Sequence, residues 1–522
     1  MPTSEESKFS SFRNVVISCR SLSHYESKRF KTLLPQILAT FIVMCINILV
    51  GFTYGYSAIF IPQIMQTQNS TEPDVIPVTT TAIAWIISCP MLITPIGAIS
   101  GGFIMDAIGR LNTVKIMAIP SIIGWSLLAL ATNVPMLIIG RLFTGIAMEW
   151  AANPAAVYIT EISRPDVRGS FTSSCSLGVS IGIILVYVQG WYLDWRIVAW
   201  ICVGYTIVST VFIFFLPESP TWLISKNRTQ NAKKSLEFFY KYQPQPENKN
   251  SSFAEMQLAV LVRENAIKER ERQELSKNGA MQMLKTFGQP IGYKPIFITM
   301  GLYFFQQFSG IHVILFNGVI FVKEMGTTID PYLATIYIGV MRLVMTIVNM
   351  ALMKRFRRRT LLMISGVGMA LFMSISGMYT KWLQEGSTTK TWIPLTALMF
   401  YFVFAIGFMV IPFAIQAEVF PLVIRGVAHA IVSSLANFIV FCALQAYFPT
   451  KDFFGGSYGI QFFYGVMALG GALFVFVFMP ETHNKKLSEI EAYFWKHTTY
   501  LSVSQEEDDA DLKKVKVLAS VK

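Results

Sequence analysis

The chain has 522 residues, of which 53% are hydrophobic and 14% charged, and its formal net charge is +12. Soluble domains carry roughly a quarter charged residues, so a chain this apolar has too little polar surface to cover itself in water. The basic residues gather beside apolar stretches, between residues 226 and 294 and near the termini. This placement favours the cytoplasmic loops of a membrane protein and excludes a nucleic-acid-binding surface as the reason for the charge.

Twelve apolar stretches are long enough to cross a bilayer as helices, for which about 20 residues suffice. Six come before a polar segment and six after it. We expect the spans near residues 33–61, 81–105, 114–132, 135–160, 172–191 and 196–216, and then near 295–322, 332–353, 361–380, 392–416, 427–448 and 460–479. The sequence thus predicts an all-α membrane protein in five parts: an N-terminus at 1–32, a six-helix bundle at 33–216, a linker with short amphipathic helices at 217–294, a second bundle at 295–480 and a tail at 481–522.

The loops set the expected orientation. Residues 62–78 contain no Lys or Arg, whereas residues 226–294 are rich in both. By the positive-inside rule, the linker and both termini are expected in the cytoplasm and the first loop outside, with the plasma membrane as the expected location. Asn69 begins an Asn-Ser-Thr sequon in that outer loop and is a candidate glycosylation site.

The sequence contains no catalytic, metal-binding or cofactor-binding motif in a structural context that fits it. Six cysteines are present, but none forms a C-x-x-C pair. The segment Gly178-Val179-Ser180-Ile181-Gly182 matches the nucleophile elbow of hydrolases, which needs a strand before it and a helix after it. Here it lies inside an apolar stretch, where Gly178 and Gly182 predict a small-residue face for helix packing. We therefore expect a protein that is not an enzyme and that uses no metal or cofactor.

Two sequence marks occur once in each half of the chain. The first is a glutamate followed seven residues later by Arg-Gly, and the second is a Pro-Glu pair after the sixth span of each half. They lie at Glu161 with Arg168, Glu418 with Arg425, Glu218 and Glu481. The marks recur at nearly the same interval, which indicates a duplicated six-span unit with a solute site between the two pseudo-symmetric halves. Such acids and arginines at helix ends can form pairs that favour one conformation over another.

Several motifs occur in a specific order along the chain. They are Gly101 to Arg110 after the second span, Gly140-Arg141 in the fourth, Pro217-Glu218-Ser219 after the sixth, Gln306-Gln307-Phe308-Ser309-Gly310 in the seventh, and Pro480-Glu481-Thr482 after the last. Together they resemble the sugar-porter branch of the major facilitator superfamily, over about residues 45 to 490. Within that branch the chain is most similar to the facilitated trehalose transporters of insects.

The resemblance implies a twelve-helix carrier that exposes a central cavity to each side in turn. It implies that Gln306 and Gln307 bind sugar hydroxyls, because an amide offers both donors and an acceptor. Asn317 follows on the same helical face. A role in helix–helix hydrogen bonding is the alternative for the two glutamines. Asp106 and Arg110 are implied to act in gating, with the repeated helix-end residues.

Other cavity positions of the family carry different residue types here. The polar or aromatic residues expected in spans five, seven, eight, ten and eleven fall on Ser176, His312, Arg342, Phe413 and Ser433, and Asn437 is a further candidate in span eleven. In addition, the second-half loop motif at residues 354–359 has neither an acidic partner nor a glycine. Selectivity for glucose therefore does not follow from the resemblance.

Arg342 is the most informative of these changes. A mid-span arginine costs roughly 2.5–3.5 kcal/mol on insertion scales, so it should be paired or face water. It either binds an acidic or phosphorylated solute or pairs with Glu149, another intramembrane charge. His312 is expected to replace an amide as a neutral hydrogen-bonding group, with pH sensing as the alternative.

The first span bears on energy coupling. In the resemblance, proton-linked porters carry an aspartate after Gly-Tyr, whereas this chain has Ser57, although the partner Arg141 remains. We therefore expect a uniporter of a sugar such as trehalose or a hexose, with Glu149 as an alternative proton site. The competing hypotheses are a non-transporting solute sensor and a carrier of small organic anions that uses Arg342. The lipid bilayer is the expected partner, nucleic acid is not, and a monomer would suffice.

Overall fold

The computed structural model describes residues 30–67, 76–164, 166–244, 252–421, 424–482, 485 and 487–496. Within these residues every regular element is an α-helix. Asn69 and the tail from residue 497 onward lie outside the described residues.

The first half contains six spans. They are α2 (Phe30–Thr67), α3 (Thr80–Ile108), α4 (Arg110–Ile116) with α5 (Ala118–Ala129), α6 (Val134–Ile162), α7 (Arg168–Tyr192) and α8 (Trp195–Ile213). Polar caps start several of them, because the first backbone N–H groups of a helix need acceptors. The Thr79 hydroxyl accepts from the Ala82 N–H, and the Asn133 side chain accepts from the Met136 N–H.

The linker contains α9 (Pro220–Ser225), α10 (Thr229–Phe239) and α11 (Phe253–Phe287). The expectation of short helices is wrong for the last of these, which runs for 35 residues. Gly279 interrupts the charged pattern there, but a single glycine costs only about 1 kcal/mol in a helix, too little to end it. Near its start, Leu258 and Leu261 of α11 pack against Trp222 and Leu223 of α9.

The second half repeats the six-span plan. Its helices are α12 (Pro290–Phe308), α13 (Ile311–Phe316), α14 (Gly318–Glu324), α15 (Pro331–Arg355), α16 (Arg358–Gln384), α17 (Ile393–Phe404), α18 (Ile406–Val419), α19 (Arg425–Phe453), α20 (Ser457–Phe478) and the short α21 (Leu487–Lys496). Among the described residues, eleven helical segments are long and apolar enough to cross a membrane. The twelfth span is the broken series α12, α13 and α14.

Gly310 marks the break between α12 and α13. Its φ is +94°, and a Cβ added there would lie 2.6 Å from the Tyr464 ring. Only glycine fits both the left-handed backbone and the narrow space. The break places the end of α12 and all of α13 in the middle of the protein.

Glycines also bring α2 and α7 close together. A Cβ on Gly182 would lie 2.2 Å from the Ile48 carbonyl oxygen, and a Cβ on Gly51 would lie 2.2 Å from the Val179 carbonyl oxygen. The backbones therefore touch, as small residues allow between membrane helices. The Gly178–Gly182 motif is thus a packing face, as predicted.

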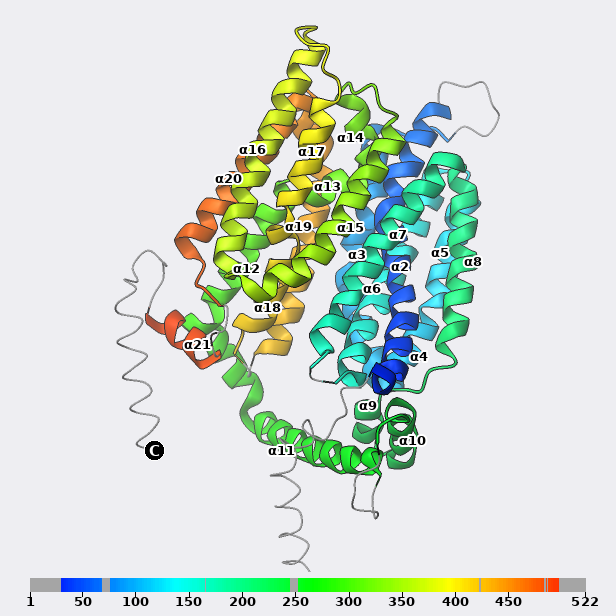
Figure 1. Ribbon diagram of the computed structural model, residues 1–522, viewed down its shortest axis with the longest axis vertical. Coiled ribbons are helices and arrows are strands. Elements are labelled where there is room, and N and C mark those ends of the chain that lie inside the picture. The colour runs from blue at the N-terminus through cyan, green and yellow to red at the C-terminus, as the bar shows by residue number, and fades with distance from the viewer. Residues whose placement is uncertain are drawn as a thin grey trace, which may run out of the picture.

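Within the described residues, the main contacts between the two halves pair α3 with α19, α7 with α15, and α2 with both α13 and α14. We call the end of the protein that holds α9, α10 and α11 the linker end. The halves spread apart toward the linker end and converge at the opposite end (Figure 1). Near that opposite end, the Tyr187 hydroxyl donates to the Leu315 carbonyl at 2.6 Å, and Gln445 Nε2 donates to Ser88 Oγ at 3.1 Å. The structure therefore shows the halves joined at the end opposite the linker.

Candidate functional site

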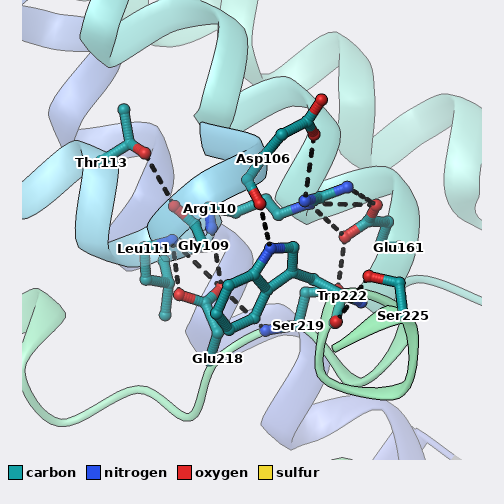
Figure 2. A network of polar contacts seen from close by, with 10 residues as sticks. All are labelled: Asp106, Gly109, Arg110, Leu111, Thr113, Glu161, Glu218, Ser219, Trp222 and Ser225. Carbon is teal, nitrogen blue, oxygen red and sulfur yellow. Dashed lines mark hydrogen bonds and ion pairs between the residues drawn. The ribbon is translucent and has the colours of Figure 1, made fainter. Parts of the chain in front are cut away.

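A polar network closes the linker end of the first half (Figure 2). Arg110, the first residue of α4, donates from Nε and Nη2 to both carboxylate oxygens of Glu161 at 2.9–3.2 Å. Asp106 lies 3.7 Å from Arg110, one turn earlier. Glu161 also accepts from the Ser219 hydroxyl. A forked, charge-assisted bond of this kind fixes both distance and angle between the helices that carry it.

Glu218 caps α4 from the linker side. Its carboxylate accepts from the backbone N–H groups of Arg110 and Leu111 at 3.1 Å and of Asn112 at 3.3 Å. A carboxylate at a helix N-terminus satisfies free N–H groups and the helix dipole together. Gly109 permits the approach, since its φ is +110° and a Cβ there would lie 2.5 Å from Glu218 Oε2.

The second half contains the same network. Arg358 pairs with Glu418, and its Nη1 donates to Thr482 Oγ1 at 3.0 Å. Glu481 accepts from the backbone N–H groups of Arg358 at 3.2 Å and Arg359 at 3.3 Å. The loop motif at residues 354–359 therefore finds its acidic partner on α18, outside the motif itself.

The repeated arginines behave differently from these acids. Arg168 is exposed, and Glu161 pairs with Arg110 rather than with it. Arg425 donates from Nε to the Phe420 carbonyl at 3.2 Å. In the loop between α6 and α7, the Arg164 guanidinium donates to Asp166 at 2.6 Å and lowers the pKa of that carboxyl group. The networks within each half thus leave Arg168 available for other partners.

The two central glutamines of α12 are both buried, but they differ in their hydrogen bonds. Gln306 Nε2 donates to the Phe408 carbonyl at 2.7 Å, and Gln306 Oε1 accepts from Gln307 Nε2 at 3.2 Å. Gln306 therefore joins α12 to α18, as the packing alternative proposed. The Oε1 atom of Gln307 has no hydrogen-bond partner, and neither has Oδ1 of Asn317. These two carbonyls can accept bonds from a solute.

A small pocket adjoins Gln307. Val313, Tyr447 and Tyr464 line it as well. No motif marks the two tyrosines, so sequence reasoning missed them. Their hydrophobic spacing on α19 and α20 is the same as that of ordinary packing residues.

The remaining candidates lie on α7, α18 and α19. Phe413 is 54% exposed, and its ring meets Tyr303 edge-on at a centroid distance of 5.3 Å. Ser433 accepts from Gln416 Nε2 at 2.7 Å, and Gln416 Oε1 accepts from the Tyr303 hydroxyl at 2.5 Å. Ser176 is exposed and Asn437 is partly exposed. The contributions of Tyr303 and Gln416 to this network were not visible in the sequence, because their bonds join separate spans.

Arg141 is completely buried among neutral acceptors. Its guanidinium donates to Ser57 Oγ at 2.6 Å, to the Thr53 carbonyl at 3.1 Å and to the Ile86 carbonyl at 3.3 Å. The cation is therefore held without an acid, through bonds that join α6 to α2 and α3.

Glu149 and Arg342 do not form the ion pair that the sequence left open. Glu149 accepts from Asn153 Nδ2 at 2.8 Å on its own helix. Arg342 Nε and Nη1 are buried without a hydrogen-bond partner, and so is His312 Nδ1. The His312 ring lies edge-on to Tyr54 at a centroid distance of 6.5 Å. No group of three or more metal-binding side chains occurs within the described part of the chain.

Comparisons with known proteins show which family has this architecture. The family model for "Sugar (and other) transporter" matches residues 38–494. The facilitated trehalose transporter Tret1 of Apis mellifera ligustica is 31% identical over 88% of this chain and 88% of its own length. The Tret1-2 homolog of Drosophila sechellia is 30% identical over 87% of this chain and 90% of its own length.

Solved structures agree on the fold. The inward-open conformation of the xylose transporter XylE from E. coli superposes with a TM-score of 0.67 at 22% identity, covering 87% of this chain and 98% of that one. A XylE structure bound to 6-bromo-6-deoxy-D-glucose gives a TM-score of 0.64 at 23% identity. With its twelve spans, duplicated halves and family match, the chain belongs to the sugar-transporter family of the major facilitator superfamily and is a multi-pass membrane transporter rather than an enzyme.

Proposed function

We propose that this protein is a uniporter that moves a neutral sugar, trehalose or a hexose, across the plasma membrane by alternating access. The linker end is the cytoplasmic end in this proposal, because residues 226–294 of the linker are rich in Lys and Arg. The relatives described as facilitated trehalose transporters support the sugar class.

The unpartnered carbonyls of Gln307 and Asn317 support sugar binding at the centre. A buried carbonyl without a donor costs free energy, and a solute hydroxyl removes that cost when it binds. Both side chains lie at the break in the seventh span, where carriers of this design hold their solute between the halves.

The hydrogen-bond partners of Arg141 support the proposal of uniport. Proton coupling needs a group whose charge changes as the carrier turns over, and the group beside this arginine is the hydroxyl of Ser57 at 2.6 Å. The two backbone carbonyls that complete the shell of Arg141 do not titrate either. The cation is therefore satisfied in the same way at every physiological pH.

Tracer uptake into cells that express the chain tests the proposal. Trehalose or glucose uptake should saturate and should change by less than about twofold, under 0.5 kcal/mol, when a protonophore removes the proton gradient. A large stimulation by an inward proton gradient would replace uniport by symport. Surface-expressed protein with no saturable sugar flux would instead support the sensor hypothesis.

A further inference from the structure

Arg342 lies near the middle of α15, on the face that meets the other half. Its neighbours on that face touch α7, since a Cβ on Gly339 would lie 3.3 Å from the Tyr187 ring and Thr346 Oγ1 lies 3.3 Å from Ser180 Oγ. The guanidinium thus stands where the two halves come together, at the depth where such carriers bind their solute.

The guanidinium is buried and unpaired. Arg342 is only 8% exposed, and none of the described residues accepts a hydrogen bond from its buried Nε and Nη1 atoms. Within the described residues no carboxylate lies within ion-pair distance of it. Arginine cannot lose its proton in a protein, and an uncompensated buried charge is strongly destabilising. A charge kept under these conditions is retained for an acceptor that comes from outside the chain.

A second unsatisfied group lies in the same region. His312 Nδ1 is buried without a partner, and Arg342 lies within electrostatic range of His312, Tyr54 and Tyr187. The Tyr187 hydroxyl cannot serve Arg342, because it already donates to the Leu315 carbonyl at 2.6 Å. The centre therefore offers a free cation on α15 and a free ring nitrogen on α13.

The free acceptors continue along the same broken span. Gln307 Oε1 at the end of α12 and Asn317 Oδ1 after α13 lack donors. Together these groups match a solute that carries an anionic group at one end and hydroxyl groups along its length. A neutral sugar would satisfy the carbonyls but would leave the guanidinium without a counter-charge.

The charge balance selects the kind of anion. Glu149 acts electrostatically on Tyr54, as Arg342 does, but its carboxylate is engaged by Asn153 at 2.8 Å. A single free cation is neutralised by a single negative charge. A phosphate monoester carries about −1.5 to −2 at neutral pH and would leave uncompensated negative charge in a site of low dielectric. A monocarboxylate fits the site better.

We infer that Arg342 anchors the carboxylate of a sugar acid, so that the central site accepts hexuronate-type solutes as well as neutral sugars. The inference rests on the proposed function, because it assigns a second solute class to the same alternating-access site. His312 and the carbonyls of Gln307 and Asn317 bind the hydroxyl groups of that solute, and Arg342 distinguishes the acid from the neutral sugar.

Paired uptake of labelled glucuronate and glucose by the full-length chain tests this inference. We expect saturable glucuronate uptake that unlabelled glucose inhibits. In Arg342→Gln, the ratio of glucuronate to glucose uptake should fall by about tenfold or more, equivalent to 1.4 kcal/mol. Arg342→Lys should retain an intermediate ratio, because lysine keeps the charge but loses the forked geometry. Lys381→Gln removes one positive charge from an exposed pair with Glu385 and serves as the matched control.

The outcomes separate the two proposals. Glucose or trehalose flux without any glucuronate uptake or inhibition overturns the inference and leaves the sugar carrier standing. No flux of any of the three solutes from surface-expressed protein overturns the proposed function itself. If Arg342→Gln does not reach the surface, the detergent-purified wild type decides: glucuronate at neutral pH must raise the melting temperature more than glucuronamide, its neutral analogue.

Glu149→Gln tests the competing role for Arg342, an ion pair with Glu149 in another conformation. If Arg342 binds the carboxylate, Glu149→Gln should leave the affinity for glucuronate within about threefold of the wild type, because the two residues then act independently. If the two residues pair, Glu149→Gln and Arg342→Gln should slow glucose uptake equally and non-additively. That second result would overturn the inference.

Discussion

The networks at the linker end and the polar groups at the centre differ in whether the chain itself supplies their partners. At the linker end, Arg110 and Arg358 each pair with a glutamate, and Glu218 and Glu481 cap the helices that begin at these two arginines. At the centre, donors and acceptors of several buried side chains lack partners. In the first region the charges of the arginines and glutamates are paired within the chain, although Nε of Arg358 lacks a hydrogen-bond partner among the described residues, whereas the charge of Arg342 in the second region is not paired by any of them.

This difference suggests a division of labour, with the linker end serving the movement of the halves and the centre serving the choice of solute. The linker-end networks join the helices within each half, which would allow each half to move as a rigid body in the proposed transport cycle. They are built from the motifs that the chain shares with other sugar porters. The centre instead carries residues that the family motif does not predict, such as Arg342 and His312. Fold and transport cycle can therefore be shared while the solute differs.

The largest effect is expected when Arg110 is removed. Arg110→Ala deletes every bond from the guanidinium to Glu161 and leaves that half-buried carboxylate to Ser219 alone. Hydrogen bonds to charged groups contribute about 1.5–3 kcal/mol, so sugar uptake per surface molecule should fall more than about tenfold. Arg110→Lys should recover part of the loss. Wild-type uptake in Arg110→Ala would show that the network is dispensable for transport.

At the centre, substitutions of Gln306 and Gln307 should cause different kinds of defect. Gln307→Ala removes a free acceptor and should raise the KM for sugar by about tenfold with little loss of thermal stability. Gln306→Ala breaks the 2.7 Å bond to Phe408 and leaves that carbonyl unsatisfied. It should lower the melting temperature of the purified protein more than it changes KM. The reverse pattern would show that Gln306 binds the sugar and that Gln307 stabilises the helix packing.

The second-half network should tolerate loss of charge better than the first. In Glu418→Gln, Arg358 keeps its 3.0 Å bond to Thr482. In Glu161→Gln, Arg110 keeps only the longer 3.7 Å contact with the exposed Asp106, because Ser219 donates to Glu161 rather than accepting from Arg110. Uptake should fall by about threefold in the first variant and about tenfold in the second, a difference of under 1 kcal/mol. Equal losses would indicate that the two networks are equivalent.

How far the sequence predicts this structure depends on the range of the interaction. Hydropathy over about 20 residues places the spans, because each segment meets the bilayer on its own. Local patterns also predict that Gly178 and Gly182 form a packing face. They do not predict that α11 continues to Phe287, since a charged helix on the surface carries no strong hydrophobic period.

The site was less predictable because its bonds join distant parts of the chain. The resemblance indicated both Gln306 and Gln307 as sugar ligands, but only the fold shows that Gln306 is engaged by Phe408. The same is true of Glu161, whose partner Arg110 lies on another helix. The sequence did indicate that Arg342 needed a partner, and the structure adds that none of the described residues supplies one.

The smallest effect concerns coupling and is expected at Arg141. Ser57→Asp places a titratable group at the 2.6 Å contact with the guanidinium. An arginine neighbour favours the charged form of an acid, so the new side chain should be ionised at neutral pH and protonated only as the pH falls. When protonated it resembles the serine, and when ionised it binds Arg141 tightly and restrains α2 against α6. Uptake should therefore decrease by about threefold as the pH rises through the pKa of Asp at this position, while the wild type and the isosteric Ser57→Asn stay flat. A pH-dependent wild type would mean that another group, with Glu149 as the first candidate, already couples transport to protons.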